Sequence, residues 1–157
     1  MWLRFGNRRR LKQLGQAWRD FKPRLGENLS IYRVGSKDEA LRVAEVFAVA
    51  CKTQGPEDLA GILIPPDCLQ GFTCRFEPYS DLPPYLRERH YEIPAAELDD
   101  PSAKNLADKV LKHPEGDYIN LEEPHVVKAA IRLKGEGIIT ISDAWERALR
   151  EHQKKKP

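Results

Sequence analysis

Three side chains that could bind a metal or carry out acid–base chemistry lie close together in the sequence. Glu88, His90 and Glu92 alternate in the segment Arg-Glu-Arg-His-Tyr-Glu-Ile, so on a strand they would share one face. Two carboxylates and an imidazole offer ligands for a divalent metal and a group that titrates near neutrality. A small metal-dependent enzyme is therefore one alternative. The favoured interpretation is a solvated strand face with Tyr91 and Ile93 pointing into the core, because charged side chains usually mark exposed surfaces.

The three cysteines fit neither a zinc site nor a disulfide framework. Cys68 and Cys74 are separated by five residues, a spacing that matches no common zinc pair. Cys51 lies in a very apolar segment and should be an inert core thiol. An odd number of cysteines without a secretory signal favours free thiols in a reducing, intracellular compartment such as the cytoplasm. We expect no structural metal and no cofactor.

Charge is distributed very unevenly along the chain. Residues 1–34 contain nine basic and two acidic side chains, whereas residues 35–153 carry a net charge of −8 and residues 154–156 are lysines. This division indicates contact with a polyanion or a membrane surface, or contacts between the basic and acidic parts of the chain. The candidate residues for binding nucleic acid or another anion are Arg4, Arg8, Arg9, Arg10, Lys12 and Arg19.

The same basic segment has the periodicity of an amphipathic helix. Leu11, Leu14, Trp18 and Phe21 recur at intervals of three and four residues, which would place them on one side of a helix. Pro23 should end that helix. This apolar stripe is the candidate interface if it is exposed, and part of the core if it packs against the rest of the chain.

The elements that would position these residues are a mixture of helices and short strands. Strands are predicted from short β-branched or aromatic runs at 29–34, 62–64, 72–77, 89–93 and 138–141. Helices are predicted from capping residues and apolar periodicity at 36–53, 100–113, 123–134 and 142–152. The predicted fold is a single compact α+β domain with short mixed or antiparallel strands, several packed helices and the basic N-terminal helix.

The first helix of this domain is expected to be the central one. It begins with a capping box of Ser36 and Glu39, and it is apolar on nearly every side. A helix with that pattern belongs inside a protein, so we expect Val46, Phe47 and Ala50 to be almost fully buried.

The domain organisation follows from these patterns. We expect a basic helical arm over residues 1–28, a single α+β domain over residues 29–153 and a basic tail over residues 154–157. No stretch of the sequence is long and apolar enough to span a membrane, and we expect a soluble protein.

The predicted function is that of a non-enzymatic accessory or adaptor protein. The sequence contains no phosphate-binding glycine loop, dinucleotide fingerprint, zinc-protease motif or serine elbow. Clustered arginines and lysines neutralise phosphates without any further motif, so nucleic acid or a nucleoprotein is the expected partner, together with a protein partner in a larger assembly. A peripheral membrane protein with Trp2, Leu3, Phe5 and Trp18 at the lipid surface is the other alternative to the enzyme.

Overall fold

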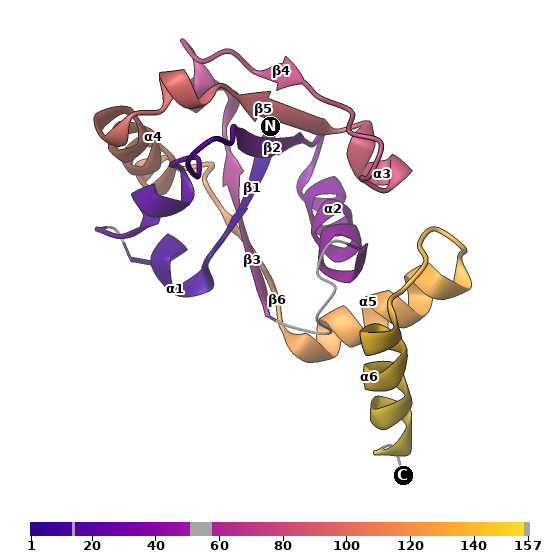
Figure 1. Cartoon of the computed structure of the whole chain (residues 1–157). Coiled ribbons are helices and arrows are strands. Elements are labelled where there is room, and N and C mark those ends of the chain that lie inside the picture. The colour runs from indigo at the N-terminus through magenta and orange to yellow at the C-terminus, as the bar shows by residue number, and fades with distance from the viewer. Residues whose placement is uncertain (14, 51–57, 156–157) are drawn as a thin grey trace.

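An antiparallel sheet of six strands runs through the centre of the molecule, in the order β4-β5-β2-β1-β3-β6 (Figure 1). The computed structural model describes residues 1–13, 15–50 and 58–155. The strands are β1 (Trp2–Gly6), β2 (Leu29–Arg33), β3 (Leu59–Ile64), β4 (Arg75–Phe76), β5 (His90–Ile93) and β6 (Tyr118–Leu121). The α-helices are α1 (Arg8–Leu11), α2 (Lys37–Ala50), α3 (Pro84–Arg87), α4 (Asp100–Lys112), α5 (Glu123–Gly135) and α6 (Asp143–Lys154). Three short 3₁₀ helices complete the described elements: η1 (Ala17–Asp20), η2 (Pro66–Leu69) and η3 (Ala95–Glu97). The predicted α+β class is confirmed.

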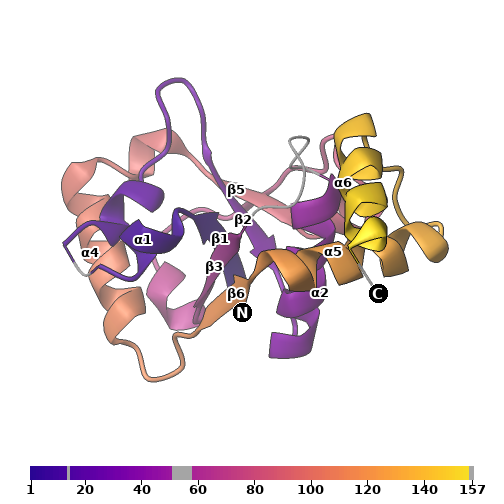
Figure 2. The same ribbon diagram turned by 90° about the horizontal axis from the view of Figure 1, so that it is seen from below.

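Helices cover both faces of the sheet and enclose two hydrophobic cores. Helices α2, α5 and α6 lie on one side, and α1 and α4 lie on the other (Figure 2). Strand β3 shows how the sheet divides the cores, because every residue in it is buried. Leu59 and Leu63 pack into the core beneath α2 and α5, whereas Ala60, Ile62 and Ile64 pack into the core beneath α4. This alternation is the two-residue period of a strand.

The N-terminal segment belongs to the body of the protein, which corrects the expectation of a separate arm over residues 1–28. Strand β1 lies between β2 and β3, and it pairs with β3 along its whole length. Leu3 and Phe5 alternate along β1, and both are buried in the core beneath α2. Two apolar residues with a period of two are typical of a half-buried strand. Loss of β1 would expose both of its neighbours.

The long amphipathic helix expected after β1 is also replaced by shorter elements. Helix α1 has only four residues, and the Asn7 side chain accepts hydrogen bonds from the first free amides of that helix. A turn that includes Gly15 separates it from η1, because glycine weakens a helix interior. Leu11, Ala17 and Phe21 on either side of this turn are all fully buried, and Leu11 and Phe21 belong to the core beneath α4.

The predicted capping box at the start of α2 is present, except that the Glu39 carboxylate does not bond to the amide of Ser36. The Glu39 amide donates to the Ser36 hydroxyl at 3.1 Å, as a capping box requires. The Glu39 carboxylate accepts from the Gly35 amide at 2.6 Å and from the Arg89 guanidinium at 2.7 Å. The side chain of Glu39 therefore ties the start of α2 to the loops at the ends of β2 and β5.

Helix α2 is buried less evenly than its composition indicates. Val46 is fully buried, but Phe47 and Ala50 are only partly buried, so the prediction for these two was wrong in degree. Phe47 stacks on Phe5 of β1 with ring centroids 4.1 Å apart, and its remaining surface faces an opening beside β1. Glu45 is buried and pairs with Arg132 of α5, so the helix is not apolar all round.

Two further strand assignments differ from the sequence expectation. Tyr118–Leu121, which was not predicted, forms edge strand β6 against β3. The predicted strand over 138–141 has no strand partner, and Ile139 and Ile141 pack instead against the core beneath α2 as a connection into α6. None of the helices in the described ranges is both long enough and apolar enough to cross a membrane.

Candidate functional site: a basic corner

Two of the six predicted anion-binding residues, Arg4 and Arg10, are bound to Asp20. The Arg4 guanidinium donates from Nε to the Asp20 carbonyl oxygen at 2.9 Å and from Nη1 to the Ser30 carbonyl oxygen at 3.0 Å. Burial lowers the pKa of Arg4 to about 10, since it penalises the charged form. Arg10 forms an ion pair of 2.9 Å with the buried Asp20 carboxylate, which also accepts from the Asn7 amide. Arg4 and Arg10 therefore organise the first thirty residues.

A third predicted residue, Arg8, pairs with the acidic part of the chain. Its guanidinium lies 2.9 Å from the Asp58 carboxylate and 3.7 Å from that of Glu122. Lys22 pairs with Asp100 at the start of α4 in the same way, at 2.5 Å. The basic N-terminal segment thus uses part of its charge on contacts with the acidic body, which is one of the alternatives that the charge distribution indicates.

The remaining three predicted residues are exposed and lie at one corner of the molecule, near α4. Arg9 lies within α1, Lys12 follows the last residue of α1, and Arg19 lies on η1. Arg19 and Lys104 of α4 both approach the half-buried Trp18 ring, at 6.0 Å and 4.8 Å from its centroid. We call Arg9, Lys12, Arg19 and Lys104 the basic corner. Within the described part of the chain, none of the four forms an ion pair.

The apolar stripe that was the candidate interface is mostly core. Leu11 and Phe21 have no exposed surface, and Trp18 is partly buried against the same core. Leu14 lies outside the described residues. Because apolar groups must be exposed in order to insert into a lipid surface or a partner, Leu11 and Phe21 cannot serve as an interface in this fold.

The candidate metal or acid–base set does not come together. Glu88 follows the last residue of α3, is exposed, and lies 3.3 Å from the guanidinium of its neighbour Arg89. His90 and Glu92 do share one face of β5, but both are buried. The strand is therefore covered on both faces, which also corrects the expectation of a solvated face.

Buried His90 and Glu92 have structural partners. The His90 Nδ1 atom lies 2.7 Å from the carbonyl oxygen of Glu77, so the Nδ1 proton is donated to the backbone. The Glu92 carboxylate accepts from the Asn28 side-chain amide at 3.0 Å. A hydrogen bond with Glu92 is also the main cause of the raised pKa of Tyr79. These bonds join β4 and β5 to the loop before β2.

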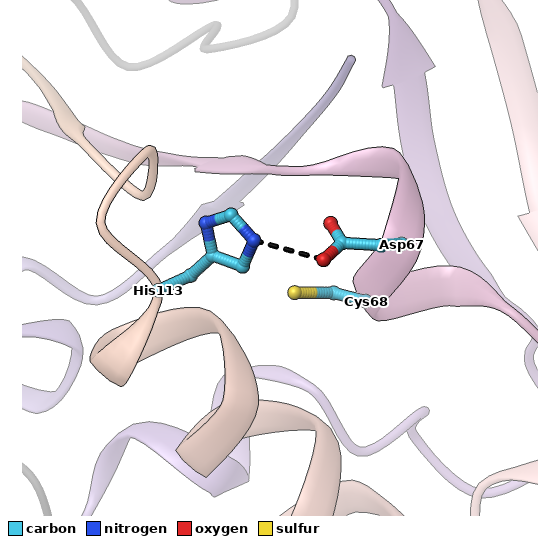
Figure 3. A group of neighbouring side chains, drawn as sticks. All are labelled: Asp67, Cys68 and His113. Carbon is cyan, nitrogen blue, oxygen red and sulfur yellow. Dashed lines mark hydrogen bonds and ion pairs between the residues drawn. The ribbon is translucent and has the colours of Figure 1, made fainter.

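A different trio of reactive side chains is brought together by the fold. Asp67 and Cys68 of η2 meet His113, which follows α4, with one potential ligand atom from each within 4.8 Å of the others (Figure 3). His113 Nε2 lies 2.9 Å from the Asp67 carboxylate. Among the described residues, no other group of three histidine, cysteine or acidic side chains is as close. No spacing in the sequence predicts this trio, because 46 positions separate Asp67 from His113.

The hydrogen bonds of the trio connect η2 to the end of α4 and favour a structural role over a metal or nucleophile site. The Glu115 amide donates to His113 Nδ1 at 3.1 Å, so the proton of the neutral ring is on Nε2 and is donated to Asp67. A metal on Nε2 would require a proton on Nδ1, where it would face the Glu115 N–H. Burial, and then the Asp67 charge, raise the pKa of the Cys68 thiol, which disfavours the thiolate that nucleophilic attack requires.

The basic corner is thus the part of the predicted site that remains open to a partner. Sequence reasoning identified three of its four cations and missed Lys104, which only the packing of α4 on η1 brings to Trp18. Comparison of the chain with protein-family models, with curated proteins and with solved structures gave no match.

Proposed function

We propose that this protein is a non-enzymatic accessory protein that docks on nucleic acid or a nucleoprotein through the basic corner. The observation that carries the proposal is the exposure of Arg9, Lys12, Arg19 and Lys104 without carboxylate partners in the described part of the chain. Arginine and lysine side chains free of internal partners are available to phosphates, and their binding releases counterions from the nucleic acid.

The contrast with neighbouring basic residues supports this choice. Arg4, Arg8 and Arg10 lie in the same segment, yet each is committed to a carboxylate or a backbone carbonyl. At the basic corner, by contrast, the described residues provide no carboxylate partner. The net charge of −8 over residues 35–153 would repel a polyanion, so binding would be confined to this corner.

Nucleic acid is favoured over a lipid surface by the burial of the apolar stripe. Membrane attachment by an amphipathic segment needs apolar side chains that enter the lipid. Leu3, Phe5, Leu11 and Phe21 are buried, and Trp2 packs edge-on against Tyr91 at 5.0 Å between ring centroids. Phosphate recognition needs only the exposed cations.

Charge reversal with a matched control tests the proposal. The corner variant carries Arg9→Glu, Lys12→Glu and Arg19→Glu. The control carries the same change of net charge on the opposite side of the sheet, through Lys128→Glu, Arg147→Glu and Arg150→Glu on α5 and α6, where the three side chains are exposed (Figure 2). Binding to labelled duplex and single-stranded oligonucleotides is followed by fluorescence anisotropy at about 50 mM salt, where electrostatic contacts are strong.

We expect the corner variant to bind at least about tenfold more weakly than the control, because phosphate contacts supply most non-specific affinity. Melting temperatures should stay close to that of the wild type in both variants, since exposed charges contribute little to stability. Equal losses in the two variants would show that only net charge matters. Absence of wild-type binding to either oligonucleotide would make the proposal wrong.

A further inference from the structure

The sheet opens between its two central strands and leaves a cavity. Strands β1 and β2 are paired only at Trp2 with Arg33 and at Leu3 with Tyr32, although β1 continues to Gly6 along β3. Beyond these pairs the two strands separate, and a cavity of about 430 Å³ lies beside them. That volume is within the range of roughly 300–1,000 Å³ found for small-molecule sites.

A largely buried cation takes part in lining this cavity. Where β1 and β2 are not paired, the Arg4 guanidinium donates to the carbonyl oxygen of Ser30 in β2, and it also donates to the carbonyl oxygen of Asp20. These two bonds use Nε and Nη1. Among the described residues, no acceptor forms a hydrogen bond with Nη2. The buried polar atoms that lack a partner in this part of the chain belong to Arg10, Asp20 and Arg87, so Nη2 of Arg4 is not one of them. Nη2 therefore has donors to offer to an occupant of the cavity.

The other charges at the cavity set its preference for a ligand. Arg24 and Glu27, both exposed, contribute to its lining from the loop before β2. Together with Arg4, they give the lining one excess positive charge. An anion with a single charge matches that balance, whereas a doubly charged phosphate would leave an excess negative charge close to Glu27.

Apolar side chains also line the cavity. Phe47 of α2 stacks on Phe5 of β1 with 18° between the ring planes, and Leu29 and Leu59 contribute to the same lining. This arrangement explains why Phe47 is only half-buried: the part of its surface that faces away from the core borders the cavity. A flat or branched apolar group would cover that surface.

We propose that this cavity is a binding site for a small organic monocarboxylate. The carboxylate would accept hydrogen bonds from the Arg4 guanidinium, as arginine–carboxylate pairs do. The apolar body of the ligand would lie against Phe47 and Leu59. This site is separate from the basic corner, since it uses neither the exposed cations nor Trp18.

The test uses four probes and the full chain. Benzoate and phenylacetate combine one negative charge with a flat body, benzyl alcohol lacks the charge, and phenyl phosphate carries about two charges. Binding is followed by the chemical shifts of backbone amides in ¹⁵N-labelled protein. We expect saturable binding of at least one carboxylate with a dissociation constant of about 1 mM or lower, with shifts concentrated at Gly6, Ser30 and Phe47. Benzyl alcohol should bind at least roughly tenfold more weakly, because the charge-assisted bond is lost.

Two variants connect the binding to the cavity. Arg24→Gln removes an exposed charge and should weaken carboxylate binding about threefold or more without loss of folding. Arg4→Lys keeps the charge but removes the planar fork, and should weaken binding about tenfold or more. Because Arg4 also supports β2, the folding of Arg4→Lys is checked from the dispersion of its amide spectrum. If Arg4→Lys does not fold, the result for Arg24→Gln decides the test. The proposal would be overturned if neither carboxylate bound saturably, or if benzyl alcohol bound as tightly as the carboxylates. It would also be overturned if phenyl phosphate bound more tightly than the carboxylates, or if Arg24→Gln bound them as tightly as the wild type.

Discussion

The side chain of Phe21 distinguishes a structural N-terminal segment from a detachable arm. Phe21 has no exposed surface and belongs to the core beneath α4, together with Leu11. Replacement of a fully buried phenylalanine by alanine removes its transfer free energy and leaves a cavity, which together lower the free energy of unfolding by about 3–5 kcal/mol. Leu25, four residues later, is fully exposed. Leu25→Ala is therefore a matched control that should change stability by less than about 0.5 kcal/mol.

Thermal and urea unfolding, followed by circular dichroism, measure the difference. In a domain of this size each kcal/mol shifts the melting temperature by about 2–4 °C, so Phe21→Ala should melt roughly 6–20 °C below the wild type. The dependence of stability on urea should keep the same slope in both variants if only stability has changed. If Phe21→Ala melted within about 2 °C of Leu25→Ala, the segment would not be part of the core, and the account of the N-terminal fold would be refuted.

Two further predictions concern single side chains. Glu39→Gln should destabilise the protein more at about pH 7 than at about pH 3. The Gly35 amide, and then Arg89, hold the pKa of the Glu39 carboxyl below its ordinary value near 4.5. The stabilisation by the ionised Glu39 is therefore present above that value and is lost as the pH falls through the lower folded-state pKa. Equal effects of the substitution in urea titrations at the two pH values would contradict this. Cys68 and Cys74 should react with iodoacetamide more slowly in the native protein than in urea at about pH 8, because burial is the main factor that raises the pKa of both thiols. Peptide mass spectrometry resolves the two sites, and equal rates in native and unfolded protein would be the opposite result.

Sequence patterns predicted the helices best where a capping residue precedes an apolar face. The Ser142 hydroxyl accepts from the Trp145 amide at the start of α6, as expected. Helix α4 begins at residue 100 as predicted, and the preceding residue, Asp99, caps it by accepting from the Ser102 amide. Such signals are local, and the bonds that produce them join residues three positions apart.

The N-terminal segment shows why tertiary structure can override a periodic pattern. Leu11 and Phe21 are apolar at helical spacing, and both are indeed buried on one side. A break near Gly15 achieves the same burial with two short helices, since a core requires only that the side chains reach it. The strand that precedes them was missed because Arg4 interrupts its apolar residues, and the bonds of Arg4 to Ser30 and Asp20 cannot be read from a sequence.

The candidate site was predictable in composition but not in arrangement. Sequence analysis found the excess of positive charge, because charge is a property of residue types. It could not separate Arg9 and Arg19, which are exposed, from Arg8 and Arg10, which pair with Asp58 and Asp20. The partners lie 50 and 10 positions away and are brought together only by the folded chain.

The dependence of binding on salt tests the central claim most directly. The logarithm of the association constant of the wild type for duplex DNA is measured against the logarithm of the salt concentration. Up to four phosphate contacts at the basic corner predict a slope of about −3 to −4. Arg19→Gln should make that slope less negative by about 1, because one contact is removed. A wild-type slope between 0 and about −1, or a slope unchanged in Arg19→Gln, would contradict the assignment of nucleic-acid binding to this corner.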